Sequence, residues 1–368
     1  MNLKVTTEPD FSMVKNDGRG FFKGRWPGLT LVELLVVIAI SLIVSAVAFT
    51  IYRINTGYYL REEAFIQQQQ NLRAAFYVLG QSLRMAGNGL KVLGPDVSLI
   101  QVWSPSQVIV NKGNVSISPN PGWFSHPGSS AGGARAIFGI DGGPKQADVV
   151  TLFRAEVEYP APLGLVQQAG GNFVDLNGPV QFDTLADRNI IALVNKTQAT
   201  LLEVDRFESN RIYFVKGGRF TGPSGPPGNF PTIGSSVYNL RDVSLVTYYV
   251  DQQNFQLMAA HHDLGRLGYD VSANKSVIVA NNIEDLQIYY YYAAEVVDPE
   301  SLGLNPDLSL ARLNRDRVKA LGLAMTSRSG YGEGAYNRRR PALFNREEGS
   351  VPDNRRRNTL AEFIYLRN

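Results

Sequence analysis

The stretch "KGRWPGLTLVELLVVIAISLIVSAVAFTIYR", from Lys23 to Arg53, decides how the rest of the chain is placed. Its apolar run covers 23 residues, from Leu29 to Ile51, and 15 of them are Leu, Ile, Val or Phe. A helix needs about 20 such residues to cross a bilayer. At about −0.5 kcal/mol each, they outweigh the roughly +3 kcal/mol that a charge costs at the centre of a membrane helix. The run therefore predicts a transmembrane helix, although Glu33 lies near its start.

Basic residues before the apolar run predict its orientation. They are Lys4, Lys15, Arg19, Lys23 and Arg25. Positive charge beside a membrane helix favours the cytoplasm, so residues 1–28 are expected inside and the rest of the chain outside. An ordinary secretory signal has an apolar stretch of only about 7–15 residues before its cleavage site. The longer run, with a charge inside it, argues against an ordinary cleaved signal peptide.

The carboxylate of Glu33 needs an explanation in a membrane segment. Near one end of the helix it fits a side chain that reaches the lipid headgroups. A functional role instead requires a cation at the same depth, which a second subunit can supply.

The motif "PGLTLVELLVVIAI" resembles the class III signal of type IV prepilins and pseudopilins. In that signal a basic leader ends in Gly, here Gly28, a hydrophobic residue follows, and a Glu, here Glu33, lies four residues further on.

This resemblance implies a processing site and an assembly site. A prepilin peptidase would cut between Gly28 and Leu29 on the cytoplasmic side and methylate the new amino group of Leu29. Glu33 would pair with the N-terminal ammonium of a neighbouring subunit, an attraction that is strong in a low-dielectric helix bundle. Two positions depart from the usual pattern. The first mature residue is Leu29 where Phe is usual, and Thr50 stands where many major pilins have a proline.

A helical pattern continues beyond the membrane segment. Apolar residues recur at gaps of 7, 4, 3, 4 and 3, which is one face of an α-helix: Phe65, Leu72, Phe76, Leu79, Leu83 and Ala86. The helix is expected to end at the stop signal Gly87-Asn88-Gly89. The four glutamines before Asn71 are interpreted as a solvated face. "LRAA" from Leu72 and "RMAG" from Arg84 resemble patterns of PilW-type minor pilins at this place.

The chain after residue 87 predicts β structure. Short runs rich in Val, Ile, Tyr and Phe, such as "ADVVTLFRAEVEY" and "VSLVTYYVD", are bounded by Gly, Pro, Asn and Asp. Lys112–Lys145 and Lys216–Gly234 read as long loops. The predicted fold class is α+β and pilin-like, with a long N-terminal helix packed on a largely antiparallel sheet. The predicted parts are a leader at 1–28, a helix at 29–87 whose segment 29–51 is transmembrane or filament core, and a β-rich head at 88–368.

Composition excludes several kinds of chemistry. The chain of 368 residues contains no cysteine, which removes disulfides, thiolate catalysis and cysteine metal sites. Its three histidines leave little for acid–base catalysis near neutral pH. Adjacent residues on a strand point to opposite faces, so His261 and His262 do not predict a metal site. "DLNG" at Asp175–Gly178 does not have the spacing of an EF-hand loop, and neither do the acids Asp298, Glu300 and Asp307.

Two further clusters have ordinary structural interpretations. The run Tyr289–Tyr292 alternates between the faces of a strand and favours core packing, with a subunit contact as the alternative. Arg338–Arg340 and Arg355–Arg357 suggest phosphate binding, but Glu347, Glu348 and Asp353 lie between them. A solvated or salt-bridged surface is the prediction there, and nucleic acid is not expected as a partner.

The sequence thus predicts a PilW-like minor pilin of a bacterial type IV pilus, not an enzyme, with no cofactor and no metal. It would prime pilus assembly or sit at the filament tip. Expected partners are other major and minor pilins, prepilin peptidase, the inner-membrane assembly platform and, before assembly, membrane lipid. It would cross the inner membrane once, with a periplasmic head, before entering an extracellular pilus. The alternatives are a J-type pseudopilin of a type II secretion system and a membrane-anchored periplasmic enzyme or binding protein.

Overall fold

A computed structural model describes residues 30–87 and most of residues 93–365. Its gaps are residues 94–96, 98, 105–108, 111–114, 117–121, 128–135, 141–145, 158–160, 180–189, 219, 263–275, 293–317, 333–336, 344–346 and 350–351. The chain forms two compact units, Met1–Tyr59 and Leu60–Asn368. Helix α1 (Leu31–Met85) contributes residues to both units.

The first unit holds the apolar part of α1. Every residue from Leu31 to Arg53 is exposed in the structure. Backbone hydrogen bonding continues through Thr50, whose hydroxyl donates to the carbonyl of Ala46 at 2.8 Å. Thr56 donates to Tyr52 in the same way at 2.9 Å. These bonds satisfy both hydroxyl donors within the helix, so neither threonine interrupts it.

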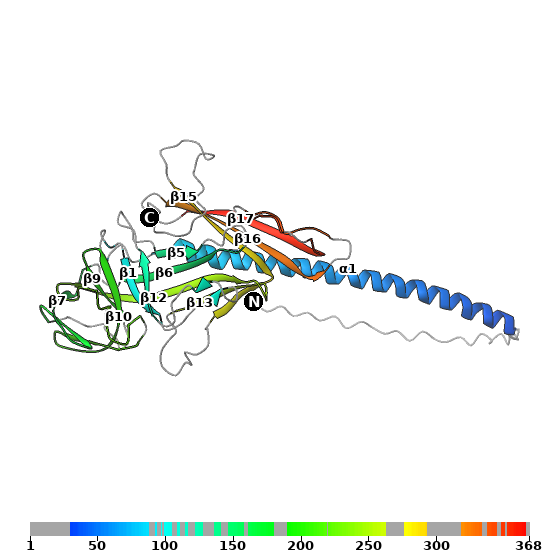
Figure 1. The fold of residues 1–368 in the computed structure, drawn as a ribbon. Helices are drawn as coiled ribbons and strands as arrows, with labels where there is room; N and C mark the ends of the chain where they lie inside the picture. The colour runs from blue at the N-terminus through cyan, green and yellow to red at the C-terminus, as the bar shows by residue number, and fades with distance from the viewer. Residues whose placement is uncertain are drawn as a thin grey trace, which may run out of the picture. The chain divides into compact units, whose positions relative to one another are not determined.

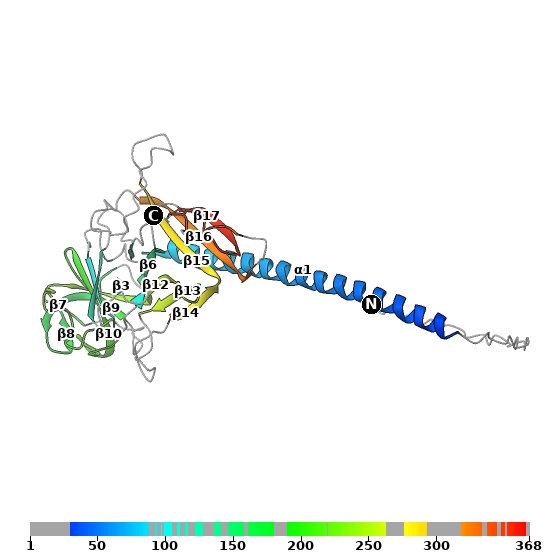
Figure 2. The same ribbon diagram turned by 45° about the vertical axis from the view of Figure 1, so that its right-hand side comes forward.

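The second half of α1 is part of a protein core. Its buried apolar residues form one row along the helix: Leu72, Ala75, Phe76, Leu79 and Leu83. The row packs against strand residues of two different sheets, including Leu152 and Val246 of one and Leu321 and Leu323 of the other. Figures 1 and 2 show this part of the helix lying between β15–β17 on one side and β5, β6, β12 and β13 on the other.

The helix ends at Met85 because the backbone turns away there. Ala86 N–H donates to the carbonyl of Leu83, and Gly87 N–H donates to the carbonyl of Phe153 at 2.9 Å. Gly87 has a φ of 75°, in the left-handed region that favours glycine at the end of a helix. The glycine after the last apolar position is the stop signal that the sequence contains.

In the described residues, seventeen strands follow the helix. Their bounds are β1 (Leu99–Ser104), β2 (Ile109–Val110), β3 (Val115–Ser116), β4 (Gly122–Pro127), β5 (Ala136–Ile140), β6 (Val149–Val157), β7 (Gly164–Ala169), β8 (Phe173–Leu176), β9 (Ile190–Asn195), β10 (Gln198–Glu208), β11 (Arg211–Phe214), β12 (Ser236–Asp251), β13 (Gln256–His261), β14 (Ser276–Asn281), β15 (Ile283–Tyr292), β16 (Val318–Gly332) and β17 (Arg355–Tyr365).

The strands form three sheets in the described part of the chain. The largest has 12 strands, with the path β14-β13-β12-β7-β8-β11-β10-β1-β4, while β6 pairs with β5 and β12, and β9 pairs with β10 and β12. The others are β15-β16-β17 and the small pair β2-β3. The pairing of β1 with β10 is parallel. Two further apolar clusters, around Phe153 and around Ile212, bury other parts of the large sheet.

The predicted fold class is therefore wrong. Over the described ranges the structure is one long helix followed by a large, mostly β domain with three sheets, not a pilin-like helix packed on a sheet head. The physical reason lies in the core, because the row on α1 contacts two separate sheets at once. A single apolar face on a helix does not reveal how many sheets share it.

The two predicted loops have different outcomes. Lys112–Lys145 contains strands β3, β4 and β5, so its interpretation as one long loop is wrong. Lys216–Gly234 contains no strand of the three sheets. Its shape depends on two aromatic side chains, because Phe220 and Phe230 are buried in different apolar clusters of the head. Phe220 also accepts a backbone hydrogen bond from Trp103 of β1 at 3.1 Å.

A chain of buried polar groups connects β6, β12 and the end of β13. The hydroxyls of Thr151 and Thr247 lie 2.8 Å apart, and Thr247 Oγ1 lies 2.7 Å from Nε2 of His262. His262 is 2% exposed. Burial disfavours the charged imidazolium, with a smaller effect from His261, and lowers the pKa of His262 to about 4. The folded protein therefore keeps this ring neutral where an unfolded chain would protonate it.

We expect His262 to make the folded state acid-sensitive. In the unfolded chain the imidazole is protonated below its ordinary pKa of 6.5. In the folded chain it is protonated only below about pH 4. Stability is thus fully present above pH 6.5 and falls by up to about 3 kcal/mol as the pH drops to about 4. Urea unfolding of the full chain in detergent micelles, repeated across this range, should show a shallower acid slope for His262→Gln. His261→Gln is the matched control, and equal slopes for the two variants would contradict the assignment.

Candidate functional site

The start of α1 carries a reciprocal pair of side chains. Oε2 of Glu33 accepts hydrogen bonds from the backbone N–H and the hydroxyl of Thr30, both at 2.9 Å. The backbone N–H of Glu33 donates to Oγ1 of Thr30 at 3.3 Å. This is a capping box, in which the side chains at the helix start satisfy amide groups that lack partners inside the helix. Thr30 is not among the site residues predicted above, although the spacing Thr-x-x-Glu is itself a sequence signal for this cap.

The capping box uses only half of the carboxylate. Both hydrogen bonds to Glu33 end on Oε2, and within the part of the chain that the structure describes Oε1 accepts none. The side chain is exposed. Glu33 therefore stabilises its own helix and still presents an oxygen to another group. The other two predicted site residues, Gly28 and Leu29, lie outside the described residues.

The surroundings of Glu33 are apolar. Residues 31–53 are all exposed, and Glu33 is the only acidic residue among them. Helix α1 is long and apolar enough to cross a membrane, and its apolar window has no side chain buried within the structure. The helix is thus compatible with a single-pass anchor near the N-terminus. A carboxylate on such a surface is shielded from water whenever lipid or another helix covers it.

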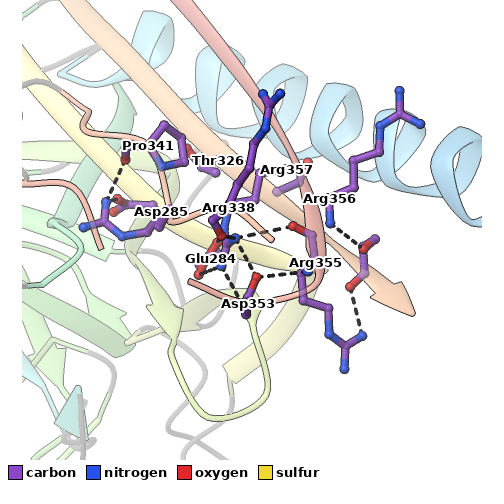
Figure 3. Close-up of polar contacts among 12 residues, drawn as sticks. Glu284, Asp285, Thr326, Arg338, Pro341, Asp353, Arg355, Arg356 and Arg357 are labelled. Carbon is purple, nitrogen blue, oxygen red and sulfur yellow. Dashed lines mark hydrogen bonds and ion pairs between the residues drawn. The ribbon is translucent and has the colours of Figure 1, made fainter. Parts of the chain in front are cut away.

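Most arginines of the two clusters in the head make hydrogen bonds or ion pairs with other residues of the head (Figure 3). Nη1 of Arg340 lies 2.9 Å from Oδ2 of Asp285, a carboxylate that is 0% exposed. Arg340 also donates to the carbonyls of Pro341 and Glu347. Gln287 donates to the other oxygen of Asp285 at 3.2 Å. The pair binds Arg340 to β15, and Leu343, three residues further on, is also buried.

Arg357 makes a second multiple contact. Its guanidinium lies 2.7 Å from Glu284 and 2.8 Å from Asp353, and the Arg357 side chain is 6% exposed. Burial opposes its charge, but the hydrogen bonds that Arg357 donates to Glu284 and Asp353 outweigh burial and raise the pKa of Arg357. Paired backbone hydrogen bonds between Arg338 and Asp353 close the same region. Two carboxylates thus neutralise one arginine between β15 and β17.

The remaining arginines of β17 anchor the helix and the neighbouring strand. The guanidinium of Arg356 lies over the ring of Phe65 of α1, 3.9 Å from its centre. Nε2 of Gln68 donates to the carbonyl and the hydroxyl of Ser327, and more weakly to the carbonyl of Arg356. Arg355 donates to the carbonyls of Ser329 and Gly330. Gln68 is buried, so the prediction that all four glutamines form a solvated face is wrong at this position.

The other sequence clusters are described only in part. His261 and His262 leave β13 in different directions, since His261 lines a surface cleft and His262 contacts Thr247. Tyr289 is buried in the sheet, while the side chains of Tyr290, Tyr291 and Tyr292 lie outside the described residues. Asp298, Glu300 and Asp307 also lie outside them. In the described ranges no group of three or more metal-ligating side chains comes together.

Asp175 of the "DLNG" stretch forms an ion pair with an arginine. Arg211 of β11 binds it through two hydrogen bonds of 2.6 and 2.8 Å. These bonds are the main reason that the pKa of Asp175 lies below its usual value. Arg211 also stacks over the ring of Phe173 at 4.1 Å. The carboxylate therefore forms an ion pair that links the neighbouring strands β8 and β11.

Comparison with known proteins adds no relative. No family model matches the chain, and neither a curated protein nor a solved structure is significantly similar to it. The interpretation of the site thus depends on its own residues.

We expect the buried ion pair of Arg340 to matter more than its exposed neighbour. Arg340→Gln leaves Asp285 buried without its cation and should lower the free energy of unfolding by about 3–5 kcal/mol. Arg339→Gln is the matched control, because Arg339 and Glu348 form a long, exposed pair at 3.7 Å. Its loss should cost less than about 1 kcal/mol. Urea unfolding of the full chain in detergent micelles measures both values. Similar losses of unfolding free energy in the two variants would contradict the prediction that the buried ion pair matters more.

Proposed function

We propose that this chain is a minor pilin of a bacterial type IV pilus, similar to the PilW-type subunits. The observation that carries the proposal is a single carboxylate, Glu33, at the start of an exposed apolar helix, five residues after Gly28. A carboxylate there is unfavourable in lipid unless a cation joins it. The methylated N-terminus of a neighbouring subunit has that charge and lies at that depth.

The architecture of the chain supports the proposal without being specific to it. The exposed apolar residues of α1 suit a helix bundle at the centre of a filament. The other half of α1 is built into the core of the β domain, so one continuous helix connects the two units. Pulling on the apolar part therefore acts directly on the head through covalent backbone. This suits a subunit that an assembly machine extracts from the membrane.

Before assembly the proposed location is the inner membrane, with the head in the periplasm. The basic residues before the apolar run favour this orientation. The head contains 309 of the 368 residues if it is counted from Leu60. Many copies of so large a domain would crowd a repeating lattice. The subunit is therefore proposed to prime assembly or to sit at the filament tip, in contact with other pilins and the assembly platform.

Processing of the N-terminus tests the proposal most directly. In cells with a prepilin peptidase, mass spectrometry should find a mature chain that begins with methylated Leu29. Gly28→Val should remain uncleaved, since the peptidase would recognise the glycine that ends the leader. Gly24→Val, in the same leader, should be processed normally. A wild-type chain that retains Met1 in such cells would refute the pilin assignment.

The role of Glu33 in assembly is tested separately from its role in capping. Glu33→Ala should be processed and inserted into the membrane, yet its amount in sheared pili should fall at least about tenfold, because its neighbour's ammonium would lose a partner. Thr30→Ala is the matched control. It removes the capping contact and leaves the carboxylate in place, so incorporation should stay near the wild-type level.

Immunoblots of sheared filaments give the amounts, and immunogold labelling gives the position of the head. Equal defects in Glu33→Ala and Thr30→Ala would mean that the carboxylate acts through the helix cap alone. Labelling along the whole shaft would exclude the tip.

A further inference from the structure

A small cleft opens on the large sheet at the place where α1 ends. Its volume is about 200 Å³. The floor consists of Leu152 of β6 and Val246 of β12, which are paired across the two strands. The last turn of α1 covers one side with Ser82 and Met85. The cleft exists because the helix stops at Met85 while the strands below it continue.

The rim of the cleft carries one arginine. Arg154 of β6 stands beside Ser244 of β12, its cross-strand partner, and His261 of β13 lies beside Val246 in the next row. Among the described side chains that line the cleft there is no Asp or Glu. A pocket that has an apolar floor and a single sign of charge at its rim favours a ligand of the opposite charge.

Arg154 has unused donor capacity. Among the described side chains its guanidinium donates only to the thioether of Met85, at 3.9 Å. A thioether is a weak acceptor, whereas a guanidinium offers five N–H donors that match a carboxylate. The C-terminal end of α1 carries about half a negative charge, which favours an arginine nearby. This attraction leaves the N–H donors of the guanidinium available for a ligand.

Two of the three hydroxyls that line the cleft, those of Ser82 and Tyr248, are already ordered. Ser82 donates to the carbonyl of Val78 at 2.9 Å, so its 2.8 Å contact with Tyr248 is donated by the tyrosine. Neither hydroxyl proton is then free for an anion. Arg154, with the hydroxyl of Ser244 beside it, is left to bind the anionic end of a ligand, while Leu152 and Val246 receive the apolar end.

We propose that this cleft binds a small monocarboxylate with an apolar group of about the size of a benzene ring. A cavity of about 150 Å³ takes up benzene, so about 200 Å³ has room for a ring and a carboxylate at its edge. The carboxylate would lie against Arg154. Two sources share this chemistry, a free aromatic or branched acid and the C-terminal residue of a peptide. The proposal does not depend on the pilin assignment.

Fluorine NMR of 4-fluorophenylacetate tests the site, with the full chain in lipid nanodiscs and empty nanodiscs as the blank. The acid should bind saturably. Its neutral analogue, 4-fluorophenylacetamide, should bind at least about tenfold more weakly, because it lacks the charge-assisted contact. A second arm titrates a short peptide ending in phenylalanine against the same peptide with an amidated C-terminus. Tighter binding of the free-ended peptide than of the acid would assign the cleft to a protein terminus, and the reverse to a free acid.

Variants locate the binding. Arg154→Gln should weaken binding of the acid at least about tenfold, and Ser244→Phe should abolish it by filling the cleft. Arg206→Gln is the control, because Arg206 is an exposed arginine on β10 that pairs with Asp205 and Glu208. Circular dichroism checks that each variant is folded. Absence of saturable binding at millimolar acid, equal binding of acid and amide, or unchanged binding by Arg154→Gln would each overturn the proposal.

Discussion

The burial of one helix row between two sheets is the constraint on which the head depends. Leu72, Ala75, Phe76, Leu79 and Leu83 supply the apolar surface that the 12-stranded and the three-stranded sheet share. Fully burying one such large side chain contributes about 1.5–3 kcal/mol. Without this row the inner faces of both sheets would meet water. The helix is therefore an internal support of the β domain and not an appendage to it.

The same helix meets a different requirement at its other end. There the surface is apolar all round, so it needs lipid or other helices on every side. The polar contacts of Gln68 and Phe65 with β17 belong to the second unit and mark where the helix is held by the head. One uninterrupted element thus carries two surface patterns for two environments, and the pattern changes along its length.

Local periodicity explains what could be predicted from the sequence. The apolar run and the positions Leu72, Phe76, Leu79 and Leu83 follow from spacing alone, and the structure exposes the first and buries the second. The burial of Gln68 could not be predicted, because its partner Ser327 lies 259 residues away. The fold class was wrong for a related reason. Strand pairing is non-local, and the number of sheets around a helix leaves no mark on its sequence.

The candidate site shows the same division between local and distant signals. Glu33 and Gly28 stay predictions from a linear motif, whereas the cap formed by Thr30 and Glu33 follows from the spacing Thr-x-x-Glu. The sequence predicts a solvated or salt-bridged surface at the arginine triplets, yet neighbours within them differ. Arg340 meets a buried carboxylate on β15, whereas Arg339 next to it remains in solvent. Only the partner strand decides which side chain of a triplet is enclosed.

The contact between Gln68 and Arg356 has a consequence for the order of events in synthesis. The two residues are separated by 288 positions, so at about 5–20 residues per second the ribosome needs roughly 15–60 s to supply the second after the first. During that interval the apolar row of α1 has no complete three-stranded sheet to cover it. The nascent chain then exposes an amphipathic helix for far longer than local folding takes. A high contact order of this kind makes the last strand the step that closes the domain, and it leaves a long period in which chaperones have a surface to bind.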